Sequence, residues 1–173
     1  MDTFIEVCTA TPNDAGIISR IAERSIRVGC AVAHRNDPRI VEAWVRNNTL
    51  TYVQPWLADP RLRLTLARLQ GRPVGTAMAS VDGRIAFCYV QPEWFRRGAG
   101  QALVRDIEAW LRERGVAQVR LDSTGTSQAF YRRMGFEQSA EAFVIDGVTA
   151  IAMHKPLIEP VGKVRPESKS MPR

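Results

Sequence analysis

The chain has 173 residues, of which 45% are apolar, and it carries a formal net charge of +6 at pH 7. This length suits a single domain with a sizeable core and does not require a second one. Nowhere do about eighteen uncharged apolar residues occur together, and the first residues contain acids instead of an apolar signal run, which excludes a membrane-spanning helix. We therefore expect a soluble cytoplasmic protein that does not associate with membranes.

Cysteine and histidine spacing gives no sign of a disulfide framework or a metal site. The three cysteines, Cys8, Cys30 and Cys88, lie far apart without a C-x-x-C pair. His34 and His154 have no Cys or acidic neighbours at the usual ligand spacing, so no bound metal is expected. The 24 basic residues are mostly spread singly along the expected helices. Ordinary surface charge is therefore a better interpretation than a nucleic-acid groove.

The first sixty residues predict one strand and two helices. Residues 4–10 alternate as a strand. Two helices follow, each opened by a capping residue, and they begin at Thr11 and Asp37. The first of them is expected to cover residues 11–26. Residues 47–60 are expected to form a loop.

The rest of the chain alternates strands with helices. From Leu62 the apolar period changes to two, and short turns predict an antiparallel meander. A helix ended by Gly115, a strand, a short helix ended by Gly135 and a closing hairpin follow. In chain order the expected ranges are strands 62–69, 74–81 and 84–90, helix 98–114, strand 117–123, helix 126–134 and hairpin 136–157.

This order of elements predicts an α/β (mixed α+β) fold. We expect a mixed, mostly antiparallel central sheet of about seven strands with helices on both faces. Residues 1–158 are expected to form one domain. Residues 159–173 contain three prolines and almost no apolar residues, so we expect a disordered tail. The sequence leaves open whether two chains pair as a homodimer.

A glycine pair at the start of helix 98–114 predicts a phosphate site. The first N–H groups of a helix have no partner inside it and lie at the positive end of its dipole. Gly98 and Gly100 would let phosphate oxygens approach without meeting a Cβ, and Arg96 and Arg97 add positive charge. The third small residue of a dinucleotide fingerprint and the Gly-Lys-Ser/Thr of a P-loop are both missing. No acidic cluster is placed to hold magnesium. The phosphates would therefore serve to bind the ligand and would not be the reacting group.

Two sequence blocks carry a resemblance to a known family. The first is YVQPEWFRRGAGQAL, residues 89–103, and the second is STGTSQAFYRRMGF, residues 123–136. Together they resemble the acetyl-CoA-binding core of the GNAT, or GCN5-related, N-acetyltransferases. The likeness runs from about Phe4 to Leu157, and its specific part consists of these two blocks and the segment between them.

The resemblance implies acetyl-CoA as cosubstrate and a set of residues that bind it. Backbone N–H groups of the glycine segment would bind the pyrophosphate, and the end of strand 84–90 would line the pantetheine arm. A backbone N–H of that strand end would also face the thioester oxygen. Phe95 stands where the family usually has Gln or Arg, which leaves the pyrophosphate to backbone amides. The implied cofactor-binding residues are Tyr89, Val90, Phe95, Arg96, Arg97, Gly98, Ala99, Gly100, Gln101, Thr124 and Phe130.

The same resemblance implies that Tyr131 is the general acid. A thiolate leaves when an amine attacks a thioester, and the pKa of a thiol is about 8.5 against about 10 for tyrosine. A nearby phenol can therefore supply the proton without being ionised beforehand. In the alternative interpretation, Tyr131 only packs the short helix together with Phe130.

Acceptor specificity is expected to come from the first two helices and the loop 47–60. Three aromatic residues could line a pocket for a small amine, namely Trp44, Tyr52 and Trp56. In the alternative interpretation they belong to the core. An amine needs a proton acceptor, but the strand 84–90 carries no acid. Glu42 and His154 are the remaining candidates, and no base is assigned.

The expected activity is transfer of the acetyl group of acetyl-CoA to a primary amine of a small molecule or a protein, by direct attack in a ternary complex. Two other interpretations stay open. One is a non-catalytic module that binds coenzyme A or an acyl-CoA. The other is an acetyltransferase for an aminoacyl-RNA amine, steered by the positive net charge.

Overall fold

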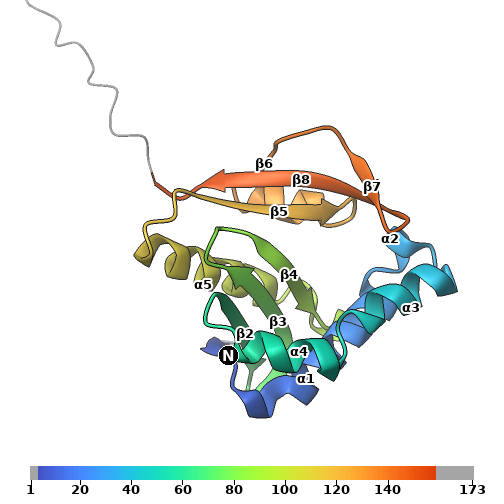
Figure 1. The fold of residues 1–173 in the computed structure, drawn as a ribbon, viewed down its shortest axis with the longest axis horizontal. Helices are drawn as coiled ribbons and strands as arrows, with labels where there is room; N and C mark the ends of the chain where they lie inside the picture. Colours follow the sequence, from blue (N-terminus) through green and yellow to red (C-terminus); the bar gives the residue numbers. More distant parts are fainter. Residues whose placement is uncertain (1–3, 159–173) are drawn as a thin grey trace, which may run out of the picture.

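The computed structural model describes residues 4–158 as two sheets that meet at one end and part at the other (Figure 1). The expected tail, residues 159–173, lies outside the described residues. The strands are β1 (Ile5–Thr9), β2 (Leu62–Leu69), β3 (Arg72–Ser80), β4 (Ile85–Val90), β5 (Gln118–Thr124), β6 (Glu137–Gln138), β7 (Phe143–Ile145) and β8 (Val148–Pro156). The first sheet has the order β1-β2-β3-β4, and in the second β8 pairs with β5, β6 and β7. The predicted fold class is confirmed; the described part of the chain divides its strands between two sheets, where one sheet of about seven was expected.

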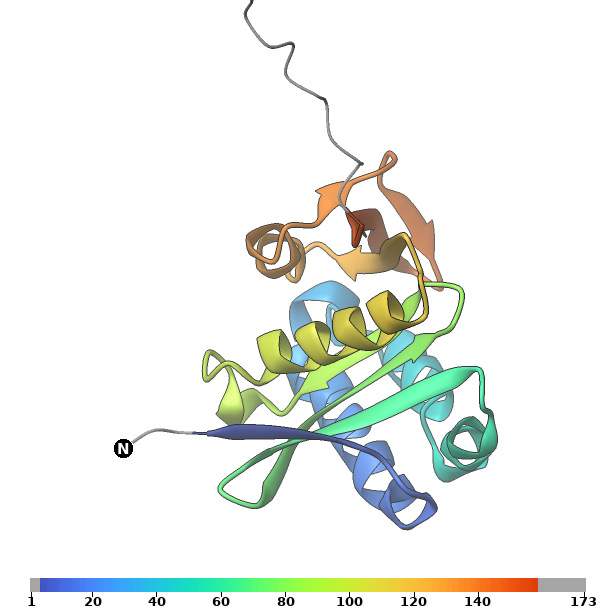
Figure 2. The ribbon, with the colours of Figure 1, turned by 90° about the vertical axis from the view of Figure 1, so that its left-hand side faces the viewer.

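Helices cover both faces of the first sheet, as predicted. They are α1 (Ala15–Arg24), α2 (Ala31–His34), α3 (Pro38–Arg46), α4 (Leu50–Ala58), α5 (Ala99–Glu113) and α6 (Gln128–Arg133), with the 3-10 turns η1 (Pro12–Asp14) and η3 (Pro92–Trp94) and the π-helical turn η2 (Ser25–Gly29). In Figure 2, α5 runs across one face of the sheet and α1 lies on the other. The helix α6 accompanies the second sheet beside β5.

Both predicted helix starts are confirmed by their capping hydrogen bonds. The Thr11 N–H donates to the Asp14 carboxylate at 2.8 Å, which closes the expected capping box. At the start of α3, the Asp37 carboxylate accepts from the Arg39 N–H at 2.9 Å. These local bonds satisfy backbone donors that a helix cannot satisfy itself.

The meander from β2 to β4 forms because its side chains alternate between two apolar cores. Leu64 and Met78 pack in the core with α1 and α4, whereas Val74 packs in the core with α5. Gln70 and Gly71 join β2 to β3 with φ angles of 52° and 76°, which suits a two-residue hairpin turn. The predicted period of two and the predicted turn are therefore confirmed.

Two helical segments differ from the sequence prediction. The expected loop 47–60 contains α4, which has Pro55 inside it. The fully buried Val53 anchors α4 against α1, and this burial outweighs the local effect of the proline. The expected helix 11–26 also changes near its end, because the Cys30 N–H donates to the Ser25 carbonyl at 2.9 Å and forms the wider turn η2.

The two sheets meet where β4 begins. Arg84 and Arg120 form a parallel bridge, and the Arg120 N–H donates to the Gly83 carbonyl at 2.9 Å. Beyond this bridge β4 and β5 diverge toward Val90 (Figure 1). The divergence leaves one edge of β4 open among the residues that the structure describes.

A buried ion pair ties α5 to the second sheet. The Glu108 residue is only 3% exposed, and its carboxylate accepts from Lys155 Nζ at 2.9 Å. Arg112 lies 3.5 Å from the same carboxylate. Because a buried carboxylate is costly without partners, this pairing fixes how α5 sits against β8.

Replacing Gly83 by alanine should lower the free energy of unfolding by about 2 kcal/mol or more. Gly83 has a φ of +97°, and an added Cβ would lie 2.5 Å from the Gln118 carbonyl oxygen. Urea-induced unfolding measures the loss. The control is Gly16→Ala in α1, where an added Cβ meets nothing within 4 Å and should cause no loss. An unchanged free energy of unfolding for Gly83→Ala would contradict the close packing of Gly83 against β5.

Candidate functional site

The start of α5 presents backbone donors that have no acceptor inside the helix. Gly98 is the N-cap residue with a φ of 88°, and the Ala102 N–H donates to its carbonyl at 3.0 Å. The N–H groups of Ala99, Gly100 and Gln101 therefore precede the first hydrogen bond of the helix. Together with the helix dipole they form a site that attracts an anion.

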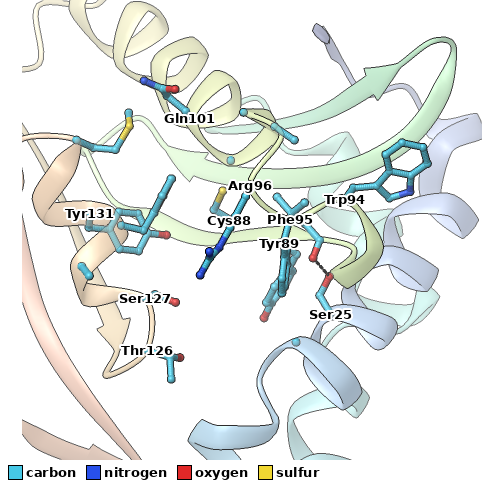
Figure 3. A pocket seen from close by; sticks show the side chains of 18 of the residues that line it. Ser25, Cys88, Tyr89, Trp94, Phe95, Arg96, Gln101, Thr126, Ser127 and Tyr131 are labelled. Carbon is cyan, nitrogen blue, oxygen red and sulfur yellow. Dashed lines mark hydrogen bonds between the residues drawn. The ribbon is translucent and has the colours of Figure 1, made fainter. Parts of the chain in front are cut away.

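Side chains from α1 hold the segment that leads into this helix. Arg24 donates to Gln91 at 2.9 Å and forms an ion pair with Glu93 at 2.5 Å, while Gln91 donates to the Pro73 carbonyl at 3.0 Å. Arg96 then adopts a left-handed φ of 60°, a conformation that costs a non-glycine residue about 1 kcal/mol. Figure 3 shows its side chain extending between Tyr131 and Tyr89.

A first cavity of about 760 Å³ lies between the start of α5, the end of β4 and α6 (Figure 3). Its volume is within the range of cofactor sites. Among its lining residues are ten that the resemblance implied, namely Tyr89, Val90, Phe95, Arg96, Gly98, Ala99, Gly100, Gln101, Phe130 and Tyr131. The fold therefore brings the two sequence blocks to one cavity.

Two of the implied residues do not line this cavity. The Arg97 guanidinium lies 5.2 Å from the centroid of the Trp94 ring, in a cation–π contact. Thr124 lines a second cavity, and its hydroxyl forms a hydrogen bond with the Ser127 hydroxyl at 3.0 Å. The side chains of Arg97 and Thr124 are thus engaged elsewhere.

The contribution of η2 to the first cavity was not predicted from the sequence. Ser25 donates its hydroxyl to the Val90 carbonyl at 3.0 Å (Figure 3). Gly29 lies so close to Phe95 that an added Cβ would be 3.1 Å from the ring atom Cζ. Further lining residues that sequence reasoning missed are Cys30, Cys88, Trp94, Thr126, Ser127, Ala129, Arg133 and Met134.

The two thiols of this cavity are not activated. Burial raises the pKa of Cys30 to about 11 and the pKa of Cys88 to about 12. A thiol with such a pKa is protonated at neutral pH, and the thiolate is the reactive form. We therefore assign neither cysteine a nucleophilic role.

Tyr131 packs its ring in the core and directs its hydroxyl into the first cavity. The residue is 7% exposed, and its ring lies edge-on to Phe130 and Phe136 with centroids 5.0 and 5.5 Å away. Figure 3 shows the hydroxyl facing the cavity, and no hydrogen bond within residues 4–158 engages it. Burial, more than nearby groups, raises the pKa of Tyr131 well above its usual value. The phenol is therefore protonated at neutral pH.

The open edge of β4 presents a backbone donor to the same region. The Gln91 N–H donates to the Val74 carbonyl at 2.9 Å, and the next pair along the register is Val90 with Gly75. Hydrogen-bonded and non-hydrogen-bonded pairs alternate along antiparallel strands, so the Val90 N–H points away from β3. The Tyr89 N–H points toward β3. Of the two residues expected to offer a donor, Val90 has the suitable orientation.

A second cavity of about 400 Å³ lies among α3, α4, β4, β5 and the β7–β8 turn. Trp44 and Trp56 line it, whereas Tyr52 is 44% exposed and packs against Trp56 at 6.3 Å between ring centroids. Tyr89 lines both cavities. The two spaces therefore adjoin at this side chain.

Tyr89 is held in place by two aromatic neighbours. Trp44 donates its indole N–H to the Tyr89 hydroxyl at 2.9 Å, and the Phe87 ring stacks on Tyr89 with centroids 5.0 Å apart. Burial raises the pKa of Tyr89, so the phenol stays protonated. Its position at the boundary is thus fixed by both a hydrogen bond and ring stacking.

Neither candidate base lines either cavity. Glu42 is engaged in a surface ion pair, and His154 lies on β8 with a buried Nδ1 that has no partner among the described residues. The carboxylates that do line the second cavity are Asp122, which pairs with Arg84 at 2.6 Å, and Asp146. The base candidates from the sequence are therefore not placed for proton transfer.

Residues 4–158 contain no cluster of three or more His, Cys, Asp or Glu side chains suited to a metal ion. Their three cysteines are free thiols. No helix in this part of the chain is both long and apolar enough to cross a membrane.

The first cavity combines a bare helix start with positive charge and an apolar stretch. An added Cβ at Gly100 would lie 3.2 Å from Phe130 Cζ, so only a bare backbone leaves room beside the helix start. Arg96 and Arg133 line the cavity and carry positive charge. Val90 and Phe130 add an apolar stretch that suits a pantetheine arm.

The acetyltransferase (GNAT) domain family matches residues 37–157 of this chain. The chain therefore belongs to the GNAT family, as its two sequence blocks indicated. The family model describes an acetyltransferase domain.

Individual proteins are also similar to this chain. The uncharacterized protein YyaT of Bacillus subtilis is 28% identical over 90 residues, which are 50% of this chain and 60% of that protein. A GCN5-related N-acetyltransferase from Rhodopseudomonas palustris has a TM-score of 0.79 at 23% identity, over 90% of this chain and 98% of the other. The PaiA N-acetyltransferase of Thermoplasma acidophilum, solved with coenzyme A, has a TM-score of 0.76 at 17% identity, over 88% and 99%. At these identities the solved structures show a shared fold.

Replacing Gly100 by valine should weaken coenzyme A binding by about tenfold or more, equivalent to 1.4 kcal/mol. The added side chain would occupy the narrow space beside Phe130 and shield the N–H groups at the helix start. Isothermal titration calorimetry measures the dissociation constant. The control is Ala109→Val, which places the same valine side chain at an exposed position of α5. Equal affinities for the two variants would exclude the helix start as the phosphate site.

Proposed function

We propose that this chain transfers the acetyl group of acetyl-CoA to a primary amine of a small molecule, by direct attack in a ternary complex. The observation that carries the proposal is the pair of adjoining cavities that share Tyr89. The first cavity suits coenzyme A, and the second offers a separate space for an acceptor. A module that only bound coenzyme A would have no need for the second space.

The first cavity would bind the donor mainly through the backbone. The N–H groups of Ala99, Gly100 and Gln101 would hold the pyrophosphate, with Arg96 adding charge. Bound acetyl-CoA supplies an acetyl thioester that an amine can attack. This arrangement does not need the Gln or Arg that Phe95 replaces, because the backbone donors do not depend on that side chain.

Two groups of the chain would stabilise the reaction. The Val90 N–H faces the open side of β4, where it can donate to the carbonyl oxygen as negative charge develops there. The Tyr131 hydroxyl can donate its proton to the departing sulfur, since its pKa lies well above that of a thiol. Both groups border the first cavity.

The second cavity would orient the acceptor. Trp44 and Phe87 fix Tyr89 at the boundary, so an amine in the second cavity must pass this phenol to reach the donor. A volume of about 400 Å³ suits a small molecule. An aminoacyl-RNA acceptor would require a basic approach to this cavity, and Arg84 is the basic residue in its lining.

Substituting Tyr131 with phenylalanine should lower kcat by about a hundredfold or more and change the coenzyme A dissociation constant less than about twofold. The hydroxyl makes no hydrogen bond within the described chain, so its loss leaves the packing of the ring intact. Thiol release from acetyl-CoA with a panel of small amines measures turnover. Tyr52→Phe is the matched control, because Tyr52 lies outside both cavities. Unchanged turnover in Tyr131→Phe would remove the acid assignment.

The value of kcat/KM should rise by about tenfold per pH unit between pH 6 and 9 for an alkylamine, whose own pKa is about 10.4. Deprotonation of the amine drives this rise. Burial raises the pKa of Tyr131 well above its usual value, so the acid stays protonated and no fall is expected in this range. A pH profile with a decline centred near pH 8 would argue against a buried phenol as the acid.

A further inference from the structure

The second cavity has an aromatic wall. Trp44, Trp56, Phe87 and Tyr89 all line it. The Trp56 and Phe87 rings lie 5.9 Å apart between centroids, and Phe87 stacks on Tyr89 at 5.0 Å. The faces of such rings carry partial negative charge and attract cations, which interact with a ring within about 6 Å of its centroid.

A carboxylate without a partner completes this cavity. Asp146 lines it from the β7–β8 turn, and no hydrogen bond or ion pair among residues 4–158 engages its side chain. The following residue, Gly147, lies so close to α3 that an added Cβ would be 2.7 Å from Ile40 Cδ1. This contact places the turn beside α3, where Asp146, an exposed residue, borders the cavity. Asp122, by contrast, is already neutralised by Arg84.

We propose that the aromatic wall and Asp146 form a subsite for a second positive charge on the acceptor, so that the acceptor class is a small diamine. This inference rests on the proposed function, because it names the substrate of the same transfer. The reacting amine must be neutral when it attacks, and it gains nothing from a carboxylate that stabilises its ammonium form. A second ammonium group stays charged, and it is the group that the ring faces and the carboxylate stabilise. An acceptor bearing a carboxylate would be repelled by Asp146.

The first experiment compares cadaverine with n-pentylamine, which has the same chain length but no second charge. The proposal expects the full-length protein to acetylate cadaverine with a kcat/KM at least about fivefold higher, equivalent to about 1 kcal/mol. Asp146→Asn should abolish most of this preference by lowering the value for cadaverine more than the value for n-pentylamine. Asparagine tolerates the left-handed φ of 49° at this position, so the turn should keep its shape. Glu141→Gln removes the same charge from an exposed residue outside the cavity and should keep the preference.

A second experiment measures binding without any reaction. The n-pentyltrimethylammonium ion carries a permanent charge and has no amine to acetylate. It should bind the protein in calorimetry, at least about fivefold more weakly in Asp146→Asn and in Phe87→Leu, which keeps an apolar side chain but removes the ring face. Glu141→Gln should bind the ion like the unaltered chain.

The results separate the two proposals. If neither amine is acetylated but the ion binds in an Asp146-dependent way, the subsite stands and the transferase proposal fails. If both amines are acetylated with equal kcat/KM and Asp146→Asn lowers both values alike, the subsite is overturned and the transferase proposal stands. Failure of the ion to bind the unaltered chain would also overturn the subsite.

Discussion

The parting of β4 from β5 is the constraint on which both cavities depend. The strands are joined at the bridge between Arg84 and Arg120 and separate before they reach Val90. A continuous sheet would place β5 against the Val90 N–H and leave no space for a ligand between the sheets. The close packing at Gly83 and the buried Glu108–Lys155 pair hold the two sheets at this angle. The opening is therefore a property of the folded chain itself.

The two cavities use different parts of the polypeptide. The first relies on backbone donors, at the start of α5 and at Val90, which any sequence that keeps this fold and these glycines can offer. The second relies on side chains, such as Trp56 and Asp146, that come from α4 and from a hairpin turn. Under the proposed function, substitutions in the second cavity would change which acceptor fits while donor binding is preserved. Tyr89 is the exception, because it belongs to both linings.

The sequence predicted those features that depend on local interactions. Helix caps, the meander and the helix that begins at the glycine pair were predicted. The two family blocks also line one cavity. The roles of their residues remain predictions. The helix α4 was missed because Pro55 is visible in the sequence and argues against a helix. The burial of Val53 against α1, which stabilises α4, is a tertiary contact that the sequence does not display. The turn η2 was missed because its contact with Val90 joins Ser25 to a residue far along the chain. The position of Asp146 depends on the contact between the β7–β8 hairpin and α3. The spacing of residues in the sequence does not predict this contact.

The hydrogen bond from Ser25 to the Val90 carbonyl also changes the character of the open β4 edge. An unpaired strand edge normally offers alternating donors and acceptors, and it can template the addition of a strand from another molecule. At Val90 the acceptor is already occupied while the donor faces outward. An incoming peptide strand would have to share the Val90 carbonyl with the Ser25 hydroxyl. Ser25 thus makes the edge at Val90 a poorer template for an added strand.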